Sequence, residues 1–224
     1  FDRGLIMLAN KERTRLVYRV GYGYNPDEEA LLKSTEFHLD NPKSRGPFII
    51  SFKQQKPFLI NDFKDIEKEI SERSREFVRK INVKSFICVP IVYEGRSEGI
   101  MAVDNHHSNR PLNQSDINLF LGIAPQLGIS INNARSYELI HEREQRFRAL
   151  SENAPDIIYT LDVNGRFSYV NPAWGKILGY QKEDVIGTFF TDFIKKEDVE
   201  RFILAFNYIR DNRQTIIDLY VSML

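Results

Sequence analysis

The chain has 224 residues, and its 31 basic and 31 acidic side chains balance, so no net charge draws it to nucleic acid or an anionic membrane. At about 150 residues per domain the length suggests one or two domains, and 42% hydrophobic residues are ample for their cores. The single cysteine, Cys88, excludes an intramolecular disulfide and fits a reducing compartment. No apolar run approaches the ~20 residues that cross a bilayer. The chain begins without Met or a signal peptide, so we expect a part of a longer protein.

The first region, residues 1–115, mixes predicted strands and helices. Apolar runs predict strands at residues 5–9, 16–20, 57–60, 86–92 and 99–103. The first two runs flank a polar turn, which is typical of a hairpin, and Gly21 and Gly23 break the second run. A short helix is predicted at residues 47–55. Apolar residues near helical spacing predict another helix at 64–80 with one buried face.

Residues 115–151 predict one long helix. Asn113 is a suitable N-cap because Asp116 follows three residues later, a weak form of the capping box. Apolar residues then alternate three and four positions apart, as in a heptad seam: Ile117, Phe120, Ala124, Leu127, Ile131 and Ala134. Pro125 interrupts this pattern, and the register shifts after Ala134. We expect a homodimer through residues 117–150; the alternative is a core helix followed by a floppy linker.

The third region, residues 152–224, opens with two short strand patterns around the tight turn Asp162-Val163-Asn164-Gly165. The second strand runs into Asn171-Pro172, where Pro172 suits the first turn of a helix. Residues 196–212 predict a longer helix, and residues 215–221 predict a strand that follows it.

These regions resemble two known families of domains. Asp162, Gly165, Asn171-Pro172, Gly179-Tyr180 and Gly187, in that order, resemble a PAS domain. The stretch KSFICVPIVYEGRSEGIMAVDN, preceded by KPFLINDF, resembles a GAF domain. The step Val89-Pro90-Ile91, the strand start Gly99-Ile100 and the helix after Asp116 carry the second resemblance.

The resemblance implies an α+β fold in which two sensory domains, each with a central antiparallel sheet flanked by helices, are joined by a long signalling helix. We place a GAF-like domain at 1–137, without the helices that normally open it. The connecting helix, a coiled coil, covers 115–151. A PAS-like domain covers 152–224, without its last strands.

As function, the resemblance implies a cytoplasmic, non-catalytic sensor and dimerisation module of a bacterial signal-transduction protein such as a sensor histidine kinase or a cyclic-dinucleotide enzyme. The module would bind a small ligand or a partner and relay the signal through the helix to a downstream output domain in cis. We expect no contact of this part with nucleic acid or a membrane.

Besides a purely structural dimerisation array with filled cores, two alternatives stay open at this point. One is a GAF-type enzyme such as free methionine sulfoxide reductase, for which Cys88 is the one available thiol. Its place in an apolar strand favours a buried, unreactive side chain instead. The other is cyclic-nucleotide binding, whose signature matches at Asn105 and Asp116 but has His106, Leu112 and Ile117 at its other positions. The Lys–Asp pair of that signature would reduce to His106–Asp116.

The histidines are interpreted without a catalytic or metal-binding role. His141-Glu142 lacks the flanking residues of a kinase phosphorylation box, so we interpret His141 as a solvated helix residue. His106-His107 are neighbours and cannot easily bind one metal together, so no metal site is predicted.

Candidate pockets come from the aromatic residues. The resemblance places a GAF-like pocket between the sheet and segments 47–63 and 76–87, with this lining: Phe48, Phe58, Asn61, Asp62, Phe77, Phe86 and Met101. A PAS-like pocket would be lined by Phe167, Tyr169, Trp174, Phe193 and Phe202. No cofactor is identified. Haem, a flavin adduct and a covalently bound bilin are disfavoured because residues 152–224 contain neither Cys nor His and the GAF-like half has no thiol in a polar loop.

Overall fold

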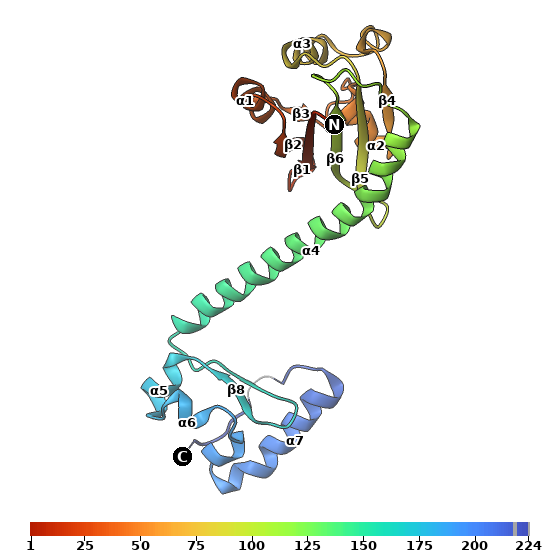
Figure 1. The fold of residues 1–224 in the computed structure, drawn as a ribbon. Coiled ribbons are helices and arrows are strands. Elements are labelled where there is room, and N and C mark those ends of the chain that lie inside the picture. Colours follow the sequence, from red (N-terminus) through yellow and green to blue (C-terminus); the bar gives the residue numbers. More distant parts are fainter. Residues whose placement is uncertain (217–218, 224) are drawn as a thin grey trace. The chain divides into compact units, whose positions relative to one another are not determined.

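The computed structural model describes residues 1–216 and 219–223, and the chain forms two compact units, Phe1–Tyr137 (unit 1) and Glu138–Leu224 (unit 2). Helices and strands mix in both units, and a long helix, α4 (Gln114–Glu152), lies between the GAF-like and PAS-like regions (Figure 1). The predicted α+β fold class is therefore confirmed.

Unit 1 is built on an antiparallel sheet. Its described strands are β1 (Arg3–Ala9), β2 (Arg15–Tyr22), β3 (Phe37–His38), β4 (Phe58–Ile60), β5 (Phe86–Tyr93) and β6 (Arg96–Asp104), in the order β3-β2-β1-β6-β5-β4. The β1–β2 hairpin is confirmed, with Leu8 opposite Val17. Gly21, however, lies inside β2, and the strand ends only before Gly23, whose φ of 78° no other residue type adopts easily.

The helices of unit 1 are α1 (Pro26–Ser34), α2 (Pro47–Gln54) and α3 (Glu72–Ile81), with a 3₁₀ turn, η1, at Phe63–Asp65. The helix predicted over 64–80 is wrong in its first half. Asp62 caps η1 by accepting the Lys64 N–H at 3.0 Å, and Ser71 caps α3 by accepting the Ser74 N–H at 3.2 Å. Two separate caps divide the segment, so Ile70 is buried from a turn rather than from a helix face.

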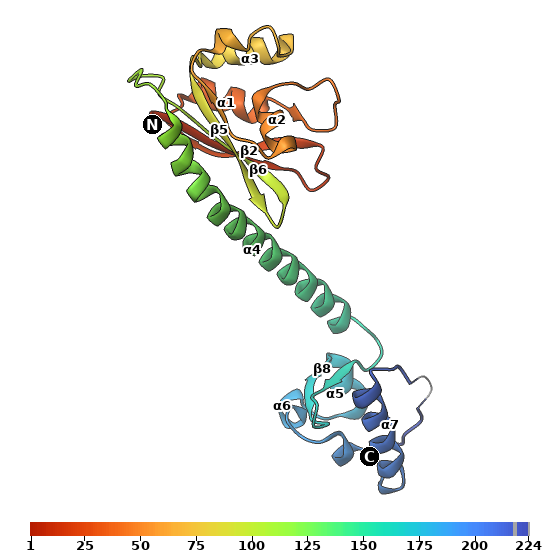
Figure 2. The same cartoon turned by 90° about the vertical axis from the view of Figure 1, so that its right-hand side faces the viewer.

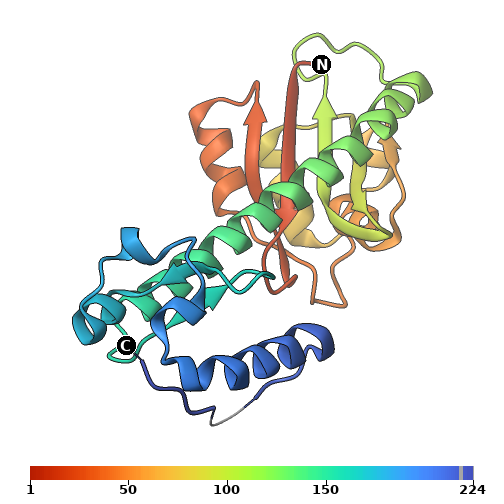
Figure 3. The same ribbon diagram turned by 90° about the horizontal axis from the view of Figure 1, so that it is seen from below.

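The two faces of the sheet carry different layers. Successive side chains of β5 alternate, so Phe86 and Cys88 belong to the core under α1, α2 and α3, whereas Ile87, Val89 and Ile91 belong to the core under α4. Figure 3 shows α4 crossing one face of the sheet, and Figure 2 shows the same layers from the side. The layer of α1, α2 and α3 on one face and helix α4 on the other therefore share the central strands.

Helix α4 begins as predicted. The Asn113 side chain accepts the Asp116 N–H at 3.3 Å, and the Asn113 N–H donates to the Asp116 carboxylate at 2.9 Å. The stripe expected to pair with a second copy is occupied, however: Ile117, Phe120 and Ala124 are buried against the sheet of unit 1, and the next two stripe residues pack on the same core. A heptad spacing suits a helix on a sheet as well as a coiled coil, and the dimer through residues 117–150 stays a prediction.

Close contacts fix α4 on unit 1. Gly128 lies so near the end of β5 that a Cβ atom there would stand 2.6 Å from the Val92 carbonyl oxygen. Further along, the Arg135 guanidinium pairs with the Glu98 carboxylate of β6 and donates to the Ala9 carbonyl at 3.2 Å. Polar contacts thus continue the apolar contact to the ends of the two central strands, β1 and β6.

Unit 2 contains the strands β7 (Tyr159–Leu161) and β8 (Phe167–Val170), the helices α5 (Pro172–Leu178), α6 (Lys182–Val185) and α7 (Lys196–Asn212), and the 3₁₀ turn η2 (Phe190–Phe193). The Asn171 side chain connects the first segments of unit 2 by hydrogen bonds. The Asn171 side chain, 2% exposed, donates to the carbonyls of Ser151 and Asp156 at 3.0 and 2.9 Å and accepts the Ile158 N–H at 3.0 Å. These bonds tie the end of α4 to the strand and to α5.

The strand expected at residues 215–221 is not seen in its described part. Ile217 and Asp218 lie outside the described residues, and the residues on either side of them belong to no ladder. Instead, Leu219, Val221 and Met223 pack half-buried on the core of unit 2, and the Lys195 N–H donates to the Ser222 carbonyl at 2.9 Å. Residues 219–223 therefore cover the core of unit 2 by side-chain packing, whereas the prediction for 215–221 was a strand paired in the sheet.

Among the described helices, none combines the length and the apolar character that crossing a membrane requires.

Candidate ligand-binding site

A cavity of about 270 Å³ lies in unit 1 between the sheet, the N-terminal end of α2 and the length of α3. Its floor comes from β5 and β6 through Phe86 and Ala102, and its walls come from Leu32 of α1 and Ile49 of α2. The cavity is therefore enclosed by segments that are far apart in the sequence.

Aromatic rings dominate the interior. Phe37 lies 5.5 Å from Phe48 and 5.1 Å from Phe77, and Phe48 lies 6.0 Å from Phe86, all measured between ring centroids. Two of these three pairs are edge-to-face, an arrangement that aromatic rings favour. Apolar groups of a ligand bind to such a surface favourably, because the contact removes apolar area of both from water.

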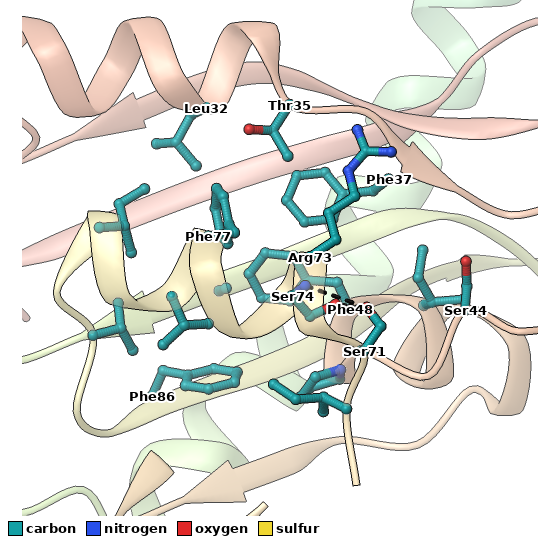
Figure 4. A pocket seen from close by; sticks show the side chains of 18 of the residues that line it. Leu32, Thr35, Phe37, Ser44, Phe48, Ser71, Arg73, Ser74, Phe77 and Phe86 are labelled. Atoms are coloured by element: carbon teal, nitrogen blue, oxygen red, sulfur yellow. Dashed lines mark hydrogen bonds between the residues drawn. The ribbon is translucent and has the colours of Figure 1, made fainter. Parts of the chain in front are cut away.

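Polar and charged side chains surround the opening. They come from the residues after α1, from β3, from the segment between β3 and α2, and from the start of α3: Thr35, Glu36, His38, Asn41, Lys43, Ser44, Ser71, Arg73 and Ser74. Figure 4 shows the Arg73 side chain reaching from α3 toward Thr35 and Phe37. The site thus has an apolar interior and a polar mouth.

One end of the cavity adjoins a buried ion pair. Arg3 is fully buried, and its Nε donates to the Asp104 carboxylate oxygens at 3.0 and 3.1 Å. Its Nη1 donates to Glu28 at 2.9 Å and to the Ile81 carbonyl at 3.0 Å. Asp104 and Tyr24 line the cavity, and burial raises the pKa of the Tyr24 phenol, so this ring stays neutral.

The structure brings together three of the seven residues predicted for this pocket. Phe48, Phe77 and Phe86 line the cavity, whereas Asn61 and Asp62 are exposed after β4. Phe58 packs half-buried on the same core without lining the cavity. Met101 lies on the opposite face under α4, because its neighbour Ala102 faces the cavity and successive strand residues alternate.

The residues predicted for a second pocket fill the core of unit 2. Phe167 and Trp174 are both 1% exposed with ring centroids 4.8 Å apart, and Phe193 and Phe202 belong to the same cluster. Tyr169 lies apart: its hydroxyl bonds Ser151 Oγ at 2.9 Å. A register shift between Thr160 and Leu161 prevents Phe167 and Tyr169 from sharing one face.

Cys88 is placed where it cannot serve a sulfoxide reductase. The side chain is fully buried in β5, and burial raises the pKa of its thiol to about 12. A buried, protonated thiol is a poor nucleophile, since the thiolate is the reactive form.

The residues of the cyclic-nucleotide signature take structural roles. Asp116 bonds the Arg110 guanidinium at 3.1 Å and caps α4, so it is not paired with His106. The Asn105 side chain donates to the Arg110 carbonyl at 2.9 Å within the same loop.

His38 lines the cavity, whereas the other three histidines lie outside it. His106 and His107 contact each other in a loop, and His141 lies on α4 with Gln145 at 2.8 Å. Across residues 1–216 and 219–223, no three His, Cys, Asp or Glu side chains gather as a metal site.

Sequence reasoning missed the part of the site that comes from residues 24–46, namely Tyr24, Leu32, Phe37 and Lys43, and also missed Arg73. A local signal for α1 was present. Asn25 and Glu28 form a full capping box, with Asn25 accepting the Glu28 N–H at 2.9 Å, and Pro26 occupies the first helical turn. That pattern would have placed a helix beside the predicted sheet.

Comparison with known proteins agrees with this geometry. The GAF domain family matches residues 1–132, and the PAS fold matches residues 145–215. The chain belongs to the GAF domain family. With its PAS region it is a sensor module that resembles the sensor proteins of signal transduction.

Individual relatives are distant. The chain is 26% identical over 129 residues to the methyl sulfide methyltransferase-associated sensor of Methanosarcina acetivorans. The aligned residues make up 56% of this chain but only 13% of that relative. Among solved structures, residues 122 to 287 of a methyl-accepting chemotaxis protein are 26% identical, with a TM-score of 0.46 over 59% of this chain and 79% of that one. A domain of a two-component sensor histidine kinase protein from Sinorhizobium meliloti 1021 is 21% identical, with a TM-score of 0.47 over 62% and 84%.

Proposed function

We propose that the chain is the cytoplasmic, non-catalytic sensory part of a signal-transduction protein, and that its GAF domain binds a small, mainly apolar organic molecule. The preformed cavity of about 270 Å³ carries this proposal, because its interior rings are already arranged around an opening to solvent. A site of this size is near the lower limit of small-molecule pockets.

Occupancy of the cavity acts on α4 through the shared sheet. Ala102 lines the cavity, and the adjacent Met101 and Val103 pack under α4. A ligand that shifts β6 therefore changes the surface on which Phe120 and Ala124 lie. In this proposal a downstream output domain in cis responds to the change in α4.

A ligand test uses calorimetry on the 224-residue chain. Ser44→Trp would place an indole at the mouth, on a loop where backbone changes are tolerated. Ser34→Trp, at the end of α1 and outside the cavity, is the matched control. We expect the first substitution to abolish binding of small aromatic compounds and the second to leave it unchanged. Equal binding by both variants would contradict the proposed site.

We also propose that the chain is a homodimer through α4, on a face other than the one expected from the heptad stripe. Positions 119, 123, 126, 130, 133, 137, 140, 144 and 147 alternate four and three apart and therefore form one seam. Five of these nine positions carry exposed apolar side chains: Leu119, Ile123, Tyr137, Ile140 and Phe147. A second copy of the same helix is complementary to this seam, since identical heptads pair in register.

Sedimentation velocity tests the dimer. The double variant Ile123→Glu, Ile140→Glu places charges in the seam and is expected to give monomers. The control variant Leu121→Glu, Leu139→Glu changes two other exposed apolar residues of α4 and is expected to remain dimeric. The same sedimentation coefficient for both variants would contradict the assigned face.

A further inference from the structure

The charges at the cavity mouth are unbalanced. Two carboxylates line the cavity, and each is already paired: Glu36 with Arg15, and Asp104 with Arg3. Two cations, Arg73 and Lys43, also line it. Within the described part of the chain, neither has a carboxylate at ion-pair distance, so the mouth carries uncompensated positive charge.

The interior dictates where a charged group of a ligand must lie. Around Phe37, Phe48 and Phe77 an ion would lose its hydration without gaining a partner, at a large cost in free energy. At the mouth, in contrast, an anion keeps part of its hydration and faces the Arg73 guanidinium. The Ser44 and Ser74 hydroxyls line the same opening. A ligand that uses both parts of the site is therefore apolar at one end and anionic at the other.

The volume limits the size of such a ligand. At about 30 Å³ for each water-sized group, a cavity of about 270 Å³ accepts roughly nine non-hydrogen atoms. A phenyl ring with a short carbon chain fills it, while a nucleotide is about twice too large.

We infer that the GAF cavity recognises a small monocarboxylic acid with an aromatic or branched apolar body, whose carboxylate lies at Arg73 and Lys43. The inference rests on the proposed function and assigns the chemical class of its ligand. Arg73 is the main determinant, because a guanidinium binds a carboxylate through two parallel hydrogen bonds and Lys43 offers a point charge.

The test compares three compounds of nearly equal shape by calorimetry on the 224-residue chain: 3-phenylpropionate, 3-phenylpropionamide and 3-phenylpropylamine. We expect the acid to bind about three- to tenfold more tightly than the amide, and the amine to bind most weakly. Added salt should weaken binding of the acid and leave the amide unaffected. An amide that binds as tightly as the acid, or an amine that binds most tightly, would overturn the inference while leaving the cavity as a ligand site.

Two variants test whether the carboxylate of the ligand lies at Arg73 in the mouth of the cavity. Arg73→Gln should remove most of the preference for the acid and leave the amide within about twofold, because Arg73 is exposed and the fold does not depend on it. Lys80→Gln, on the same helix but outside the cavity, is the matched control and should keep the preference. A preference that survives in Arg73→Gln would overturn the assigned position of the carboxylate. If neither the acid nor the amide binds the unmodified chain, the proposed function itself fails, and this inference fails with it.

Discussion

Asn171 is the side chain on which the start of unit 2 depends most. It is buried, and its amide donates to two carbonyls and accepts one backbone N–H. We predict that Asn171→Asp destabilises unit 2 by about 2–4 kcal/mol, since a carboxylate cannot donate to the two carbonyls and is buried against them. Urea unfolding followed by Trp174 fluorescence measures the effect, because this tryptophan is buried in unit 2 and the sequence has no other.

Asn153→Asp is the control for this substitution. The Asn153 side chain is exposed and makes one bond, to the Ala149 carbonyl at 2.8 Å, so the change should alter stability by less than about 0.5 kcal/mol. Similar unfolding midpoints for the two variants would refute the role assigned to Asn171.

Asp162 makes the stability of unit 2 dependent on pH. Its Oδ1 accepts the Arg166 N–H at 2.9 Å and the Asn164 N–H at 2.8 Å, and these bonds, that from Arg166 first, lower the pKa of the carboxyl. A lowered folded-state pKa stabilises the fold above the unfolded-state value of about 3.9. The contribution is then lost as the pH falls through the folded-state pKa.

We therefore predict that unit 2 loses less stability between about pH 5 and pH 3 in Asp162→Asn than in the unmodified chain, because the amide accepts the same bonds and does not titrate. Trp174 fluorescence in urea at several pH values gives the comparison. Glu183→Gln in α6, whose carboxylate accepts no hydrogen bond seen in the described part of the chain, is the control variant and should differ from the unmodified chain less than Asp162→Asn does. Parallel profiles for the unmodified chain and Asp162→Asn would contradict the assignment.

Helix α4 offers a matched pair of glycines for testing its contact with the sheet. A Cβ atom on Gly128 would stand 2.6 Å from the Val92 carbonyl oxygen, whereas one on Gly122 would meet nothing within 4 Å. We predict that Gly128→Ala destabilises unit 1 by about 1–3 kcal/mol through forced separation of helix and sheet. Gly122→Ala should instead stabilise it by about 0.5–1 kcal/mol through helix propensity. Urea unfolding followed by far-ultraviolet circular dichroism measures both, and shifts of the same sign would show that α4 does not pack on β5 at this point.

Elements with local signals were predictable from the sequence. The β1–β2 hairpin, α2 and α7 follow apolar patterns bounded by turn residues or prolines, and the α7 segment 196–212 has the predicted ends. The helix predicted over 64–80 was wrong because the caps at Asp62 and Ser71 were not weighed against the apolar spacing. Local chemistry decides such boundaries, and here it overrides periodicity.

The candidate site was predictable only in part, for a different reason. Strand β6 is buried on both faces from Ser97 to Asp104, so no alternation of apolar and polar residues indicates that Ala102 and not Met101 faces the cavity. Lys43 lies in a segment without an apolar pattern, and Arg73 lies in a predicted helix whose pattern says nothing of a partner, so only the folded chain brings them to one opening.

The two units are expected to differ in stability. Among the described residues, unit 1 has a sheet of six strands with a core on each face, whereas the sheet of unit 2 has two strands. A two-stranded sheet is marginally stable unless helices cover it. Tyr159 of β7 stays 38% exposed, as expected for a sheet face that lacks its cover, and Ile217, predicted for the same face, lies outside the described part of the chain.

We predict that unit 2 unfolds first. In urea, the transition seen by Trp174 fluorescence should precede the main loss of circular dichroism, which reports mostly on the larger unit. Coincident transitions would indicate that the units unfold together, and a later fluorescence transition would contradict the predicted order.

Hydrogen exchange on the 224-residue chain, with and without saturating 3-phenylpropionate, shows whether the cavity of unit 1 is a ligand site. We expect slower exchange at the backbone amides of α2 and α3 that surround Phe48 and Ser74, with a smaller effect in the part of α4 that packs on the sheet. Unchanged exchange throughout unit 1, or slowing confined to unit 2, would contradict the proposed ligand site.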